Sequence, residues 1–401
     1  MFSLNRAWTE WLLSDVGCRK PWLNTSSSTP PFQNEERAFF MSKKKYNVLD
    51  LFCGCGGISE GFALAGFNIA GGIDFNEYAT ITFKHNFKNA KVHNTDITIF
   101  PDKQIIEEYG DVDVIVGGPP CQGFSSANRW QKEMDDPRNK LFFEYIRFVQ
   151  RIHPKVIMIE NVRGLLTRDG GYAINRIKEI LGGEEYNISY QVLDASNYGV
   201  PQNRKRAIII GVRKDYKDRF FDFNNIKKQS KTTVDDAIGE LYSFEDKPDG
   251  KKVIETPANS PLRKFLRTKD NTILDQDIVY PAQKVQDRIK HVPQGGNWQD
   301  VPEELWPTNR KNRHSSAYKR LDPQTQSCTI DTGNAHSNYF HPVYNRIPTI
   351  RESARLQSFP DSFEFQGPRG SKYRQIGNAV PPLLAKAIAD AIMKILEDED
   401  N

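Results

Sequence analysis

A cysteine stands directly after two prolines in the run from Gly117 to Gln122. An isolated cysteine usually packs as a small, inert apolar side chain. The glycines and prolines before Cys121 argue against packing, because so restricted a turn fills a core poorly. They also follow the apolar run Val112–Val116, which places the turn at the end of a buried strand. A thiolate held on such a turn is an effective nucleophile, and we predict that role for Cys121.

A carboxyl group follows the next apolar run of the chain. Residues Lys155–Ile159 are typical of a strand, and Glu160 comes straight after them. The carboxyl ends of strands in an open α/β sheet meet at one edge, where ligands bind. Cys121 and Glu160 are therefore expected to share one pocket.

An apolar strand also runs into a glycine-rich turn and then a helix over Val48–Gly57. Glycines allow the backbone to approach a ligand closely. The turn is not G-x-G-x-x-G, so a nicotinamide dinucleotide has no specific support. A carboxylate about 20 residues further on suits ribose hydroxyls, as Asp74 would, while Phe75 could stack on an adenine and Asp96 could accept from its amino group. A single carboxylate at such a position more often caps a loop. Asp74 and Asp96 both stand at strand ends, and this shared placement favours a ligand.

The elements that must position these groups alternate between two kinds. Short β-type runs predict strands at Tyr46–Phe52, Asn68–Ile73, Val112–Val116, Lys155–Ile159, Ile188–Leu193 and Ala207–Val212. Amphipathic stretches predict crossover helices at Ser59–Leu64, Glu77–His85, Lys140–Arg151 and Tyr172–Leu181. This alternation indicates an α/β fold with a parallel sheet.

The rest of the chain divides into three further parts. Residues 1–45 combine tryptophans with a polar run and are expected to be an extension that does not fold alone. After Arg213 the pattern degrades, so 214–325 is expected to form a separate, irregular domain. Regularity returns in 326–401, with helix-compatible residues at Pro381–Leu396.

Composition excludes several classes of protein. The 401 residues are 38% hydrophobic and 26% charged, which is ordinary for a soluble protein, and no apolar run approaches the ~18 residues of a membrane span. The five cysteines are scattered and lack zinc-type spacing, so we expect no disulfide framework and no metal. No secretory signal is recognisable, which makes the cytoplasm the expected location.

Basic residues concentrate in two places although the formal net charge is only +4. The stretch from Arg204 to Lys231 holds ten basic and three acidic residues. A second cluster comprises Arg310, Lys311, Arg313, Lys319 and Arg320. Charge runs are usually solvated faces, but such concentrations also suit a phosphate backbone.

Taken together, these motifs resemble the DNA (cytosine-5) methyltransferases, from about Asn47 to Met393. The matching blocks, in the family's order, are Asp50–Phe52 with its glycines, Gly118–Gln122, Glu160–Val162, Gln202–Arg206, Arg351–Pro360 and Gly377–Pro381. The resemblance implies a Rossmann-like S-adenosylmethionine-dependent methyltransferase sheet. Residues 46–213 would be the catalytic and cofactor-binding domain, 214–325 a smaller target-recognition domain, and 326–401 a return to the catalytic domain.

The family's roles transfer onto matching positions. S-adenosylmethionine would be bound by Asp50, Phe52, Gly54, Gly57, Asp74, Phe75, Asp96 and Pro120, with Leu141 and Asn378 closing round it. Cys121 would attack C6 of the cytosine, and Glu160 would bind and protonate its N3 side. Arg204 and Arg206 would support that carboxylate and the base.

Elementary chemistry agrees with this scheme. C5 of cytosine is too weak a nucleophile to accept a methyl group unaided, but a thiolate added at C6 makes it enamine-like. A nearby acid relieves the charge that accumulates at N3. The base must leave the stacked duplex for this reaction, at a cost of a few kcal/mol.

The resemblance also implies the partners of the protein, and two alternative functions remain open. It implies a monomer acting on double-stranded DNA in a bacterial cytoplasm, associated with the nucleoid through DNA, with neither membrane nor metal. It would be the modification enzyme of a restriction-modification system, whose endonuclease acts separately on the same site. RNA methylation by the same pocket and a catalytically inactive DNA-binding regulator are the alternatives. Comparing DNA with transfer RNA as substrates tests the first, and cofactor binding without methyl transfer would favour the second.

Overall fold

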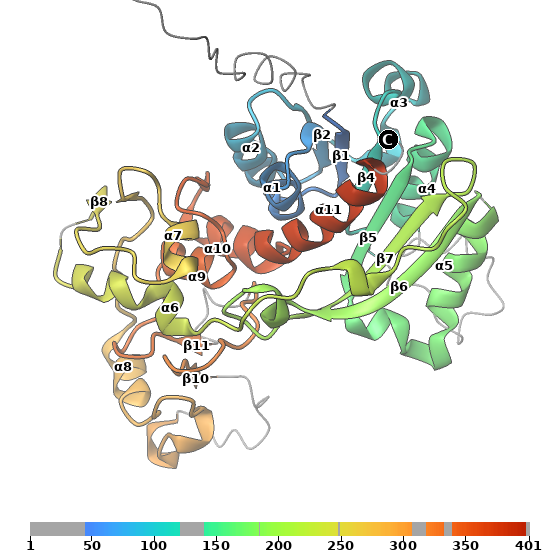
Figure 1. Ribbon diagram of the computed structural model, residues 1–401. Coiled ribbons are helices and arrows are strands. Elements are labelled where there is room, and N and C mark those ends of the chain that lie inside the picture. The colour runs from blue at the N-terminus through green and yellow to red at the C-terminus, as the bar shows by residue number, and fades with distance from the viewer. Residues whose placement is uncertain are drawn as a thin grey trace, which may run out of the picture. The chain divides into compact units, whose positions relative to one another are not determined.

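Seven strands form one sheet in the computed structural model, which describes residues 45–120, 140–183, 185–247, 249–306, 318–332 and 339–397 (Figure 1). The strand order is β3-β2-β1-β4-β5-β7-β6. The strands are β1 Asn47–Leu51, β2 Asn68–Asp74, β3 Lys91–Asn94, β4 Val114–Gly117, β5 Val156–Val162, β6 Tyr186–Asp194 and β7 Lys205–Arg213. This arrangement is a Rossmann-like α/β fold. Cys121, the extension before Lys45, and Arg310, Lys311 and Arg313 lie outside the described residues.

All six predicted strands are present, but the sheet is mixed rather than wholly parallel. Strand β7 runs antiparallel to both neighbours, β5 and β6. Only residues 195–204 connect β6 to β7, and a parallel pair needs a crossover of a dozen or more residues. Strand β3, with the sequence KVHN, was not predicted because so short and polar a run gives no β signal.

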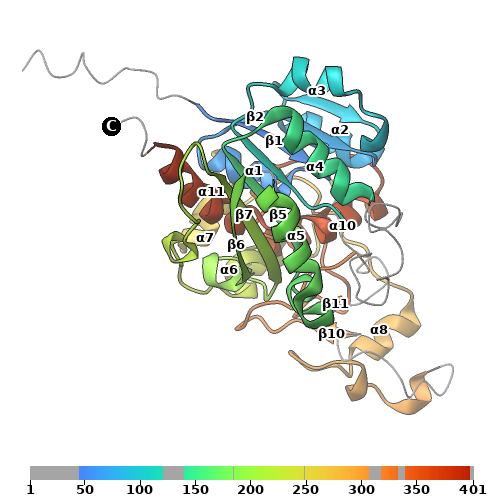
Figure 2. The same ribbon diagram turned by 90° about the vertical axis from the view of Figure 1, so that its right-hand side faces the viewer.

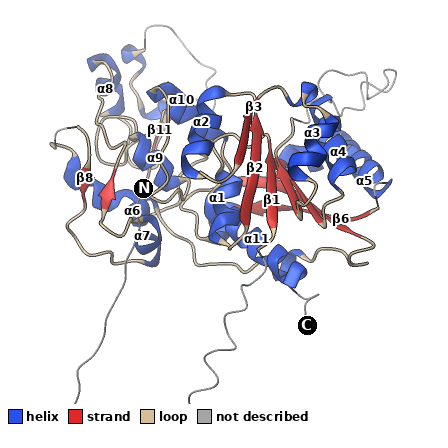
Figure 3. Cartoon of the chain, turned by 90° about the horizontal axis from the view of Figure 1, so that it is seen from above, coloured by secondary structure: helices blue, strands red, loops and turns tan. Residues whose placement is uncertain are grey.

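Helices cover both faces of the sheet, as Figure 3 shows from above. Successive strand residues point to opposite faces. Leu49 belongs to the core cluster that contains residues of α3, α4 and α5, and Val48 to the cluster that contains residues of α1, α2 and α11. The helix bounds are α1 Gly57–Leu64, α2 Glu77–Asn86, α3 Asp102–Tyr109, α4 Lys140–Ile152, α5 Tyr172–Gly183, α10 Arg369–Asn378 and α11 Pro382–Glu397. The predicted helices are confirmed, whereas α3 and α10 were missed.

The C-terminal segment completes the fold around the first strand. Helix α11 packs closely on α1, where an added Cβ at Gly61 would lie 2.4 Å from the Cβ of Ala385. The hydroxyl of Tyr46 donates to the backbone carbonyl of Leu396 at 2.6 Å. Residues at opposite ends of the described chain therefore share one core, and 45–401 form one compact unit.

Between β7 and α10 the described residues form only short elements, of which Figure 2 labels α6, α7, α8, β10 and β11. They are α6 Val234–Ile238, α7 Pro261–Leu266, α8 Gln283–Ile289, α9 Ile350–Leu356, and the strand pairs β8 Lys252–Val253 with β9 Thr272–Ile273 and β10 Lys319–Arg320 with β11 Tyr339–Phe340. Buried arginines join these pieces. Arg355 pairs with Asp361 at 2.5 Å and Glu240 at 2.8 Å, and Arg346 pairs with Glu352 at 2.8 Å. Such buried charges are tolerated because each is paired.

Within the described residues, no helix is long and apolar enough to cross a membrane.

Candidate active site

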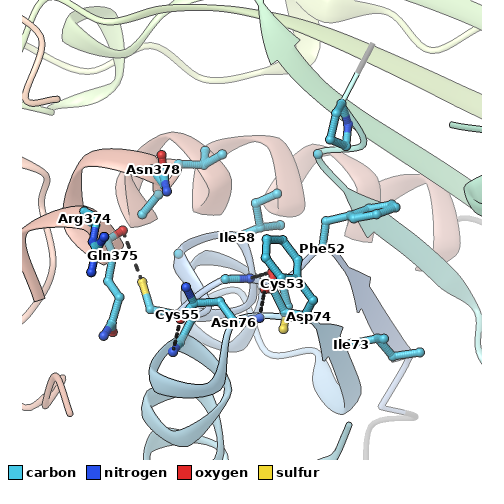
Figure 4. A pocket seen from close by; sticks show the side chains of 18 of the residues that line it. Phe52, Cys53, Cys55, Ile58, Ile73, Asp74, Asn76, Arg374, Gln375 and Asn378 are labelled. Atoms are coloured by element: carbon cyan, nitrogen blue, oxygen red, sulfur yellow. Dashed lines mark hydrogen bonds between the residues drawn. The ribbon is translucent and has the colours of Figure 1, made fainter. Parts of the chain in front are cut away.

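A cavity of about 630 Å³ opens at the carboxyl ends of β1, β2, β4 and β5 and is closed on one side by α10 (Figure 4). Crevices at this edge are where open α/β sheets bind ligands. Ten of the thirteen predicted site residues in the described chain line the cavity, and Asp50, Arg204 and Arg206 do not. The ten are Phe52, Gly54, Gly57, Asp74, Phe75, Asp96, Pro120, Leu141, Glu160 and Asn378.

The turn after β1 brings backbone to the cavity. Phe52 has φ 59° and Gly54 has φ 51°, and a left-handed Phe is a strained conformation of the kind found at ligand sites. An added Cβ at Gly54 would meet nothing within 4 Å, whereas one at Gly57 would lie 2.4 Å from the carbonyl oxygen of Val380. Gly54 therefore leaves space in the cavity, and Gly57 is required by the approach of the C-terminal segment.

Three side chains at the ends of β2 and β3 fit an adenosine. The Asp74 carboxylate accepts from the amide of Gly54 at 2.9 Å and from that of Asn76 at 2.8 Å. Burial raises the pKa of Asp74 above its ordinary value, against those hydrogen bonds. Its oxygens keep lone pairs for ribose hydroxyls, since a carboxylate accepts about four hydrogen bonds.

Phe75 and Asp96, the other two of these side chains, are exposed at the cavity. The Phe75 side chain is 77% exposed, which leaves a ring face for a nucleobase. Asp96 accepts from the Thr98 amide at 2.9 Å, and its hydrogen bonds with Thr98 lower its pKa. It stays ionised at neutral pH and can accept from an amino group.

Asp50 does not line the cavity, although it was predicted to bind the cofactor. Its carboxyl group is 1% exposed and accepts from the Ser59 hydroxyl at 2.7 Å. The other carboxyl oxygen has no hydrogen-bond partner within the described chain. Burial raises the pKa of Asp50 to about 7. Its place behind the turn makes it a positioning residue that holds α1 against β1.

Glu160 lines the cavity from β5, whereas Phe75 follows β2, three positions away in the strand order. Its carboxylate pairs with Nε of Arg206 at 2.8 Å. An added Cβ at Gly118 would lie 3.2 Å from Oε2 of Glu160, so the glycine makes room for the carboxylate. Burial raises the pKa of Glu160, and the charges of Arg206 and Arg204 oppose that shift. A carboxyl group that holds its proton more readily suits a general acid.

Arg204 does not share the role of Arg206. Its side chain is 1% exposed and donates to the carbonyls of Ile330 at 2.8 Å and Gly377 at 2.9 Å. Burial lowers the pKa of Arg204 to about 9. Its charge acts on Glu160 at a distance, and its hydrogen bonds tie the end of α10 to the segment around Ile330. Arg206 therefore supports the carboxylate directly, while Arg204 braces the wall that carries Asn378.

Two groups of residues were missed by sequence reasoning. The amide of Asn161 donates to the carbonyl of Pro119 at 2.9 Å and so holds the segment that leads to Cys121; its place beside Glu160 was the available signal. Ser371, Arg374 and Gln375 line the cavity from α10, a helix with no clear amphipathic pattern. Among the residues with described positions, no cluster of three or more His, Cys, Asp or Glu could hold a metal.

Known proteins share both the sequence and the fold. The family model for C-5 cytosine-specific DNA methylases matches residues 46–394. The Type II methyltransferase M.DdeI of Desulfomicrobium norvegicum is 36% identical over 380 residues, which cover 88% of this chain and 89% of that protein. The Type II methyltransferase M1.HphI of Haemophilus parahaemolyticus is 35% identical over 369 residues, with coverage of 90% and 91%.

Solved structures of methyltransferases resemble this chain in their fold. A candidate DNA modification methyltransferase encoded within an Escherichia coli prophage has a TM-score of 0.72 and 27% identity, over 88% of this chain and 100% of that one. The S. pombe Dnmt2 methyltransferase, at 18% identity and a TM-score of 0.54 over 89% and 100%, shares the fold. The site and the family match lead to one conclusion: the chain belongs to the C-5 cytosine-specific DNA methylases and is a DNA (cytosine-5) methyltransferase.

Proposed function

We propose that the enzyme transfers a methyl group from S-adenosylmethionine to C5 of a flipped-out cytosine in a short duplex DNA sequence, with Cys121 as nucleophile. One observation carries this proposal. A single cavity is lined both by side chains suited to adenosine, which follow β2 and β3, and by Glu160 of β5, which pairs with Arg206. Pro120, the residue before Cys121, lines the same cavity.

S-adenosylmethionine fits the part of this cavity that lies at the ends of β2 and β3. Asp74 would hold its ribose, Phe75 would stack on its adenine and Asp96 would accept from the adenine amino group. Phe52, Gly54, Gly57, Pro120, Leu141 and Asn378 would complete its surroundings. When bound there, it supplies the electrophilic methyl group.

The chain's own residues prepare the cytosine. The Cys121 thiolate forms a bond to C6, and the electron pair of the C5–C6 double bond becomes available at C5. Glu160 donates a proton toward N3, where negative charge accumulates, while Arg206 fixes the orientation of the carboxylate. After methylation, a base removes the C5 proton, and the electron pair left behind expels Cys121 as thiolate.

DNA contact is proposed for the region 214–325, acting as the target-recognition domain. Not every basic residue from Arg204 to Lys231 is available to DNA. Arg204 is buried, and Lys217 donates to the carbonyl of Ile395 at 2.6 Å. Lys227, Lys228 and Lys231 are exposed. These lysines are among the exposed basic residues of the stretch that can face phosphates.

The cellular role follows from the relatives. Both relatives described above are Type II methyltransferases. We extend that role to this chain as a monomeric modification enzyme in the bacterial cytoplasm, whose cognate endonuclease acts separately on the same site.

The test replaces Cys121 by Ser, with Cys328→Ser as the matched control because Cys328 does not line the cavity. Bisulfite sequencing of plasmid from cells that express each protein reads both activity and target sequence. The wild type and Cys328→Ser should methylate one short motif. Cys121→Ser should methylate nothing yet bind S-adenosylhomocysteine like the wild type. Methylation by Cys121→Ser would refute the mechanism, and methylation of transfer RNA in place of DNA would refute the substrate.

A further inference from the structure

Two basic residues stand at the end of the strand pair that carries Glu160 and Arg206. Strands β5 and β7 lie side by side and antiparallel (Figure 2), and the last pair in their register joins Val162 to Arg206. Arg163 follows Val162, and Lys205 precedes Arg206. Because antiparallel strands run in opposite directions, both residues lie just beyond the same last pair. They are therefore neighbours at the carboxyl end of β5.

The described residues do not balance these two charges. Both side chains are exposed, and no described residue gives the Arg163 guanidinium or the Lys205 ammonium a hydrogen bond or an ion pair. Asp194 lies opposite Lys205 in the register of β6 with β7, but its carboxylate accepts from the amide and the hydroxyl of Ser196. The Glu160 carboxylate is engaged in the ion pair described above. Two cations are thus available to an anionic ligand at this place.

A flipped cytosine would bring phosphates to the same place. The base leaves the duplex but stays joined to its sugar and to the phosphates on either side. Once Glu160 binds the N3 side of the base, those phosphates must lie within the length of one nucleotide from the carboxylate. Arg163 is three residues beyond Glu160, so their Cα atoms are separated by at most about 10 Å. A long basic side chain at this position can reach the backbone of the flipped nucleotide.

We propose that Arg163 and Lys205 bind the two phosphates that flank the flipped cytosine. This inference rests on the proposed function, because it requires the base to enter the pocket beside Glu160. Contacts to phosphates carry no sequence information but fix the position and orientation of the DNA. The two cations hold the backbone of the nucleotide while Glu160 holds its base.

Fluorescence anisotropy with labelled DNA, in the presence of S-adenosylhomocysteine and over a series of salt concentrations, tests this assignment. One duplex contains the motif that bisulfite sequencing identifies. A second duplex carries neutral methylphosphonates in place of the two phosphates that flank the target cytosine. The variants are Arg163→Gln, Lys205→Gln and the conservative Arg163→Lys. The control is Lys394→Gln, because Lys394 is exposed on α11 near Leu396, which bonds to Tyr46 before the start of β1, at the other end of the sheet.

Each glutamine variant should bind the ordinary duplex about tenfold more weakly than the wild type, as expected for a lost charge-assisted contact. The slope of log affinity against log salt concentration should become shallower by about one. Arg163→Lys should keep the wild-type slope, and Lys394→Gln should match the wild type throughout. On the methylphosphonate duplex, the wild type and both glutamine variants should bind equally, because the phosphate charges that the two cations contact are absent.

Three results would overturn the inference. The first is an unchanged affinity or salt slope for the ordinary duplex. The second is a tenfold loss that persists on the methylphosphonate duplex, which would place the contact elsewhere on the DNA. The third is a loss of S-adenosylhomocysteine affinity in a glutamine variant, measured by calorimetry, which would indicate a structural role. A wild-type enzyme that methylates no cytosine in DNA would instead refute the proposed function, whatever the variants bind.

Discussion

Replacing Gly61 by alanine should loosen the junction between α1 and α11, although alanine is the better helix former. An ideal Cβ at Gly61 would lie 2.4 Å from the Cβ of Ala385, 2.6 Å from the amide nitrogen of Lys386 and 2.6 Å from the carbonyl oxygen of Pro382. Ordinary contact begins at 3.4 Å. The two helices must therefore separate by about 1 Å locally, the difference between 3.4 and 2.4 Å, because backbone atoms cannot turn aside as a flexible side chain can.

Two opposing effects set the size of the change. Forcing an extra methyl group into a packed site costs about 1–3 kcal/mol. Alanine in place of glycine within a helix returns up to about 1 kcal/mol. The steric cost prevails because two of the three close atoms belong to the backbone, and we expect a net loss of about 1–2 kcal/mol in the free energy of unfolding.

Urea denaturation followed by circular dichroism measures this loss as a lower midpoint with an unchanged slope. The matched control is Gly182→Ala in α5, where an added Cβ meets nothing within 4 Å; its midpoint should stay equal or rise. S-adenosylhomocysteine affinity should also fall in Gly61→Ala, because α1 and Val380 both border the cavity. A midpoint for Gly61→Ala at or above that of the wild type would show that the helices separate at no cost.

Two further substitutions address the carboxyl groups of the site. Glu160→Gln should abolish methyl transfer, because an amide cannot protonate N3, while calorimetry should find S-adenosylhomocysteine binding intact; measurable transfer to radiolabelled DNA would contradict the assigned role. Asp50→Asn concerns stability. The pKa of Asp50 is raised from 3.8 to about 7 in the fold, so its neutral form stabilises the protein below about pH 4 and that contribution is lost as the pH rises through about 7. The variant lacks this loss, so between pH 4 and pH 8 its stability relative to the wild type should rise, by roughly 4 kcal/mol at most. Parallel pH profiles of the urea midpoints would exclude the assignment.

Much of the active site was predictable because its signals are local. The glycine-rich turn after β1, Asp74 at the end of β2, and Glu160 near the end of β5 each follow an apolar run. Strand ends in this architecture meet at one edge, so Glu160 was expected in one pocket with Cys121, and Asp74 and Asp96 were expected to bind a nucleoside; in the structure the three carboxyl groups line one cavity. Cys121 lies outside the described residues, and its role remains a prediction from the stiff turn and the family motif.

The different roles of neighbouring residues depend on tertiary contacts that no local sequence pattern encodes. Arg204 and Arg206 look equivalent in sequence, yet Arg204 precedes β7 and donates to the carbonyls of Ile330 and Gly377, whereas Arg206 lies in β7 and pairs with Glu160. Likewise Asp50 lies in β1 with its side chain toward Ser59 of α1, behind the turn it was expected to serve.

By itself the sequence determined the order of the α/β elements, the family and the chemical groups available, because periodicity, turns and motifs are written in neighbouring residues. Tertiary structure decided which of those groups face the cavity. In the tertiary structure β7 runs antiparallel to β5, α10 forms the wall of the cavity that carries Arg374 and Asn378, and Gly57 lies close to the backbone of Val380. These outcomes depend on residues hundreds of positions apart meeting in one core, and the energy of that packing is shared among elements rather than encoded in any one of them.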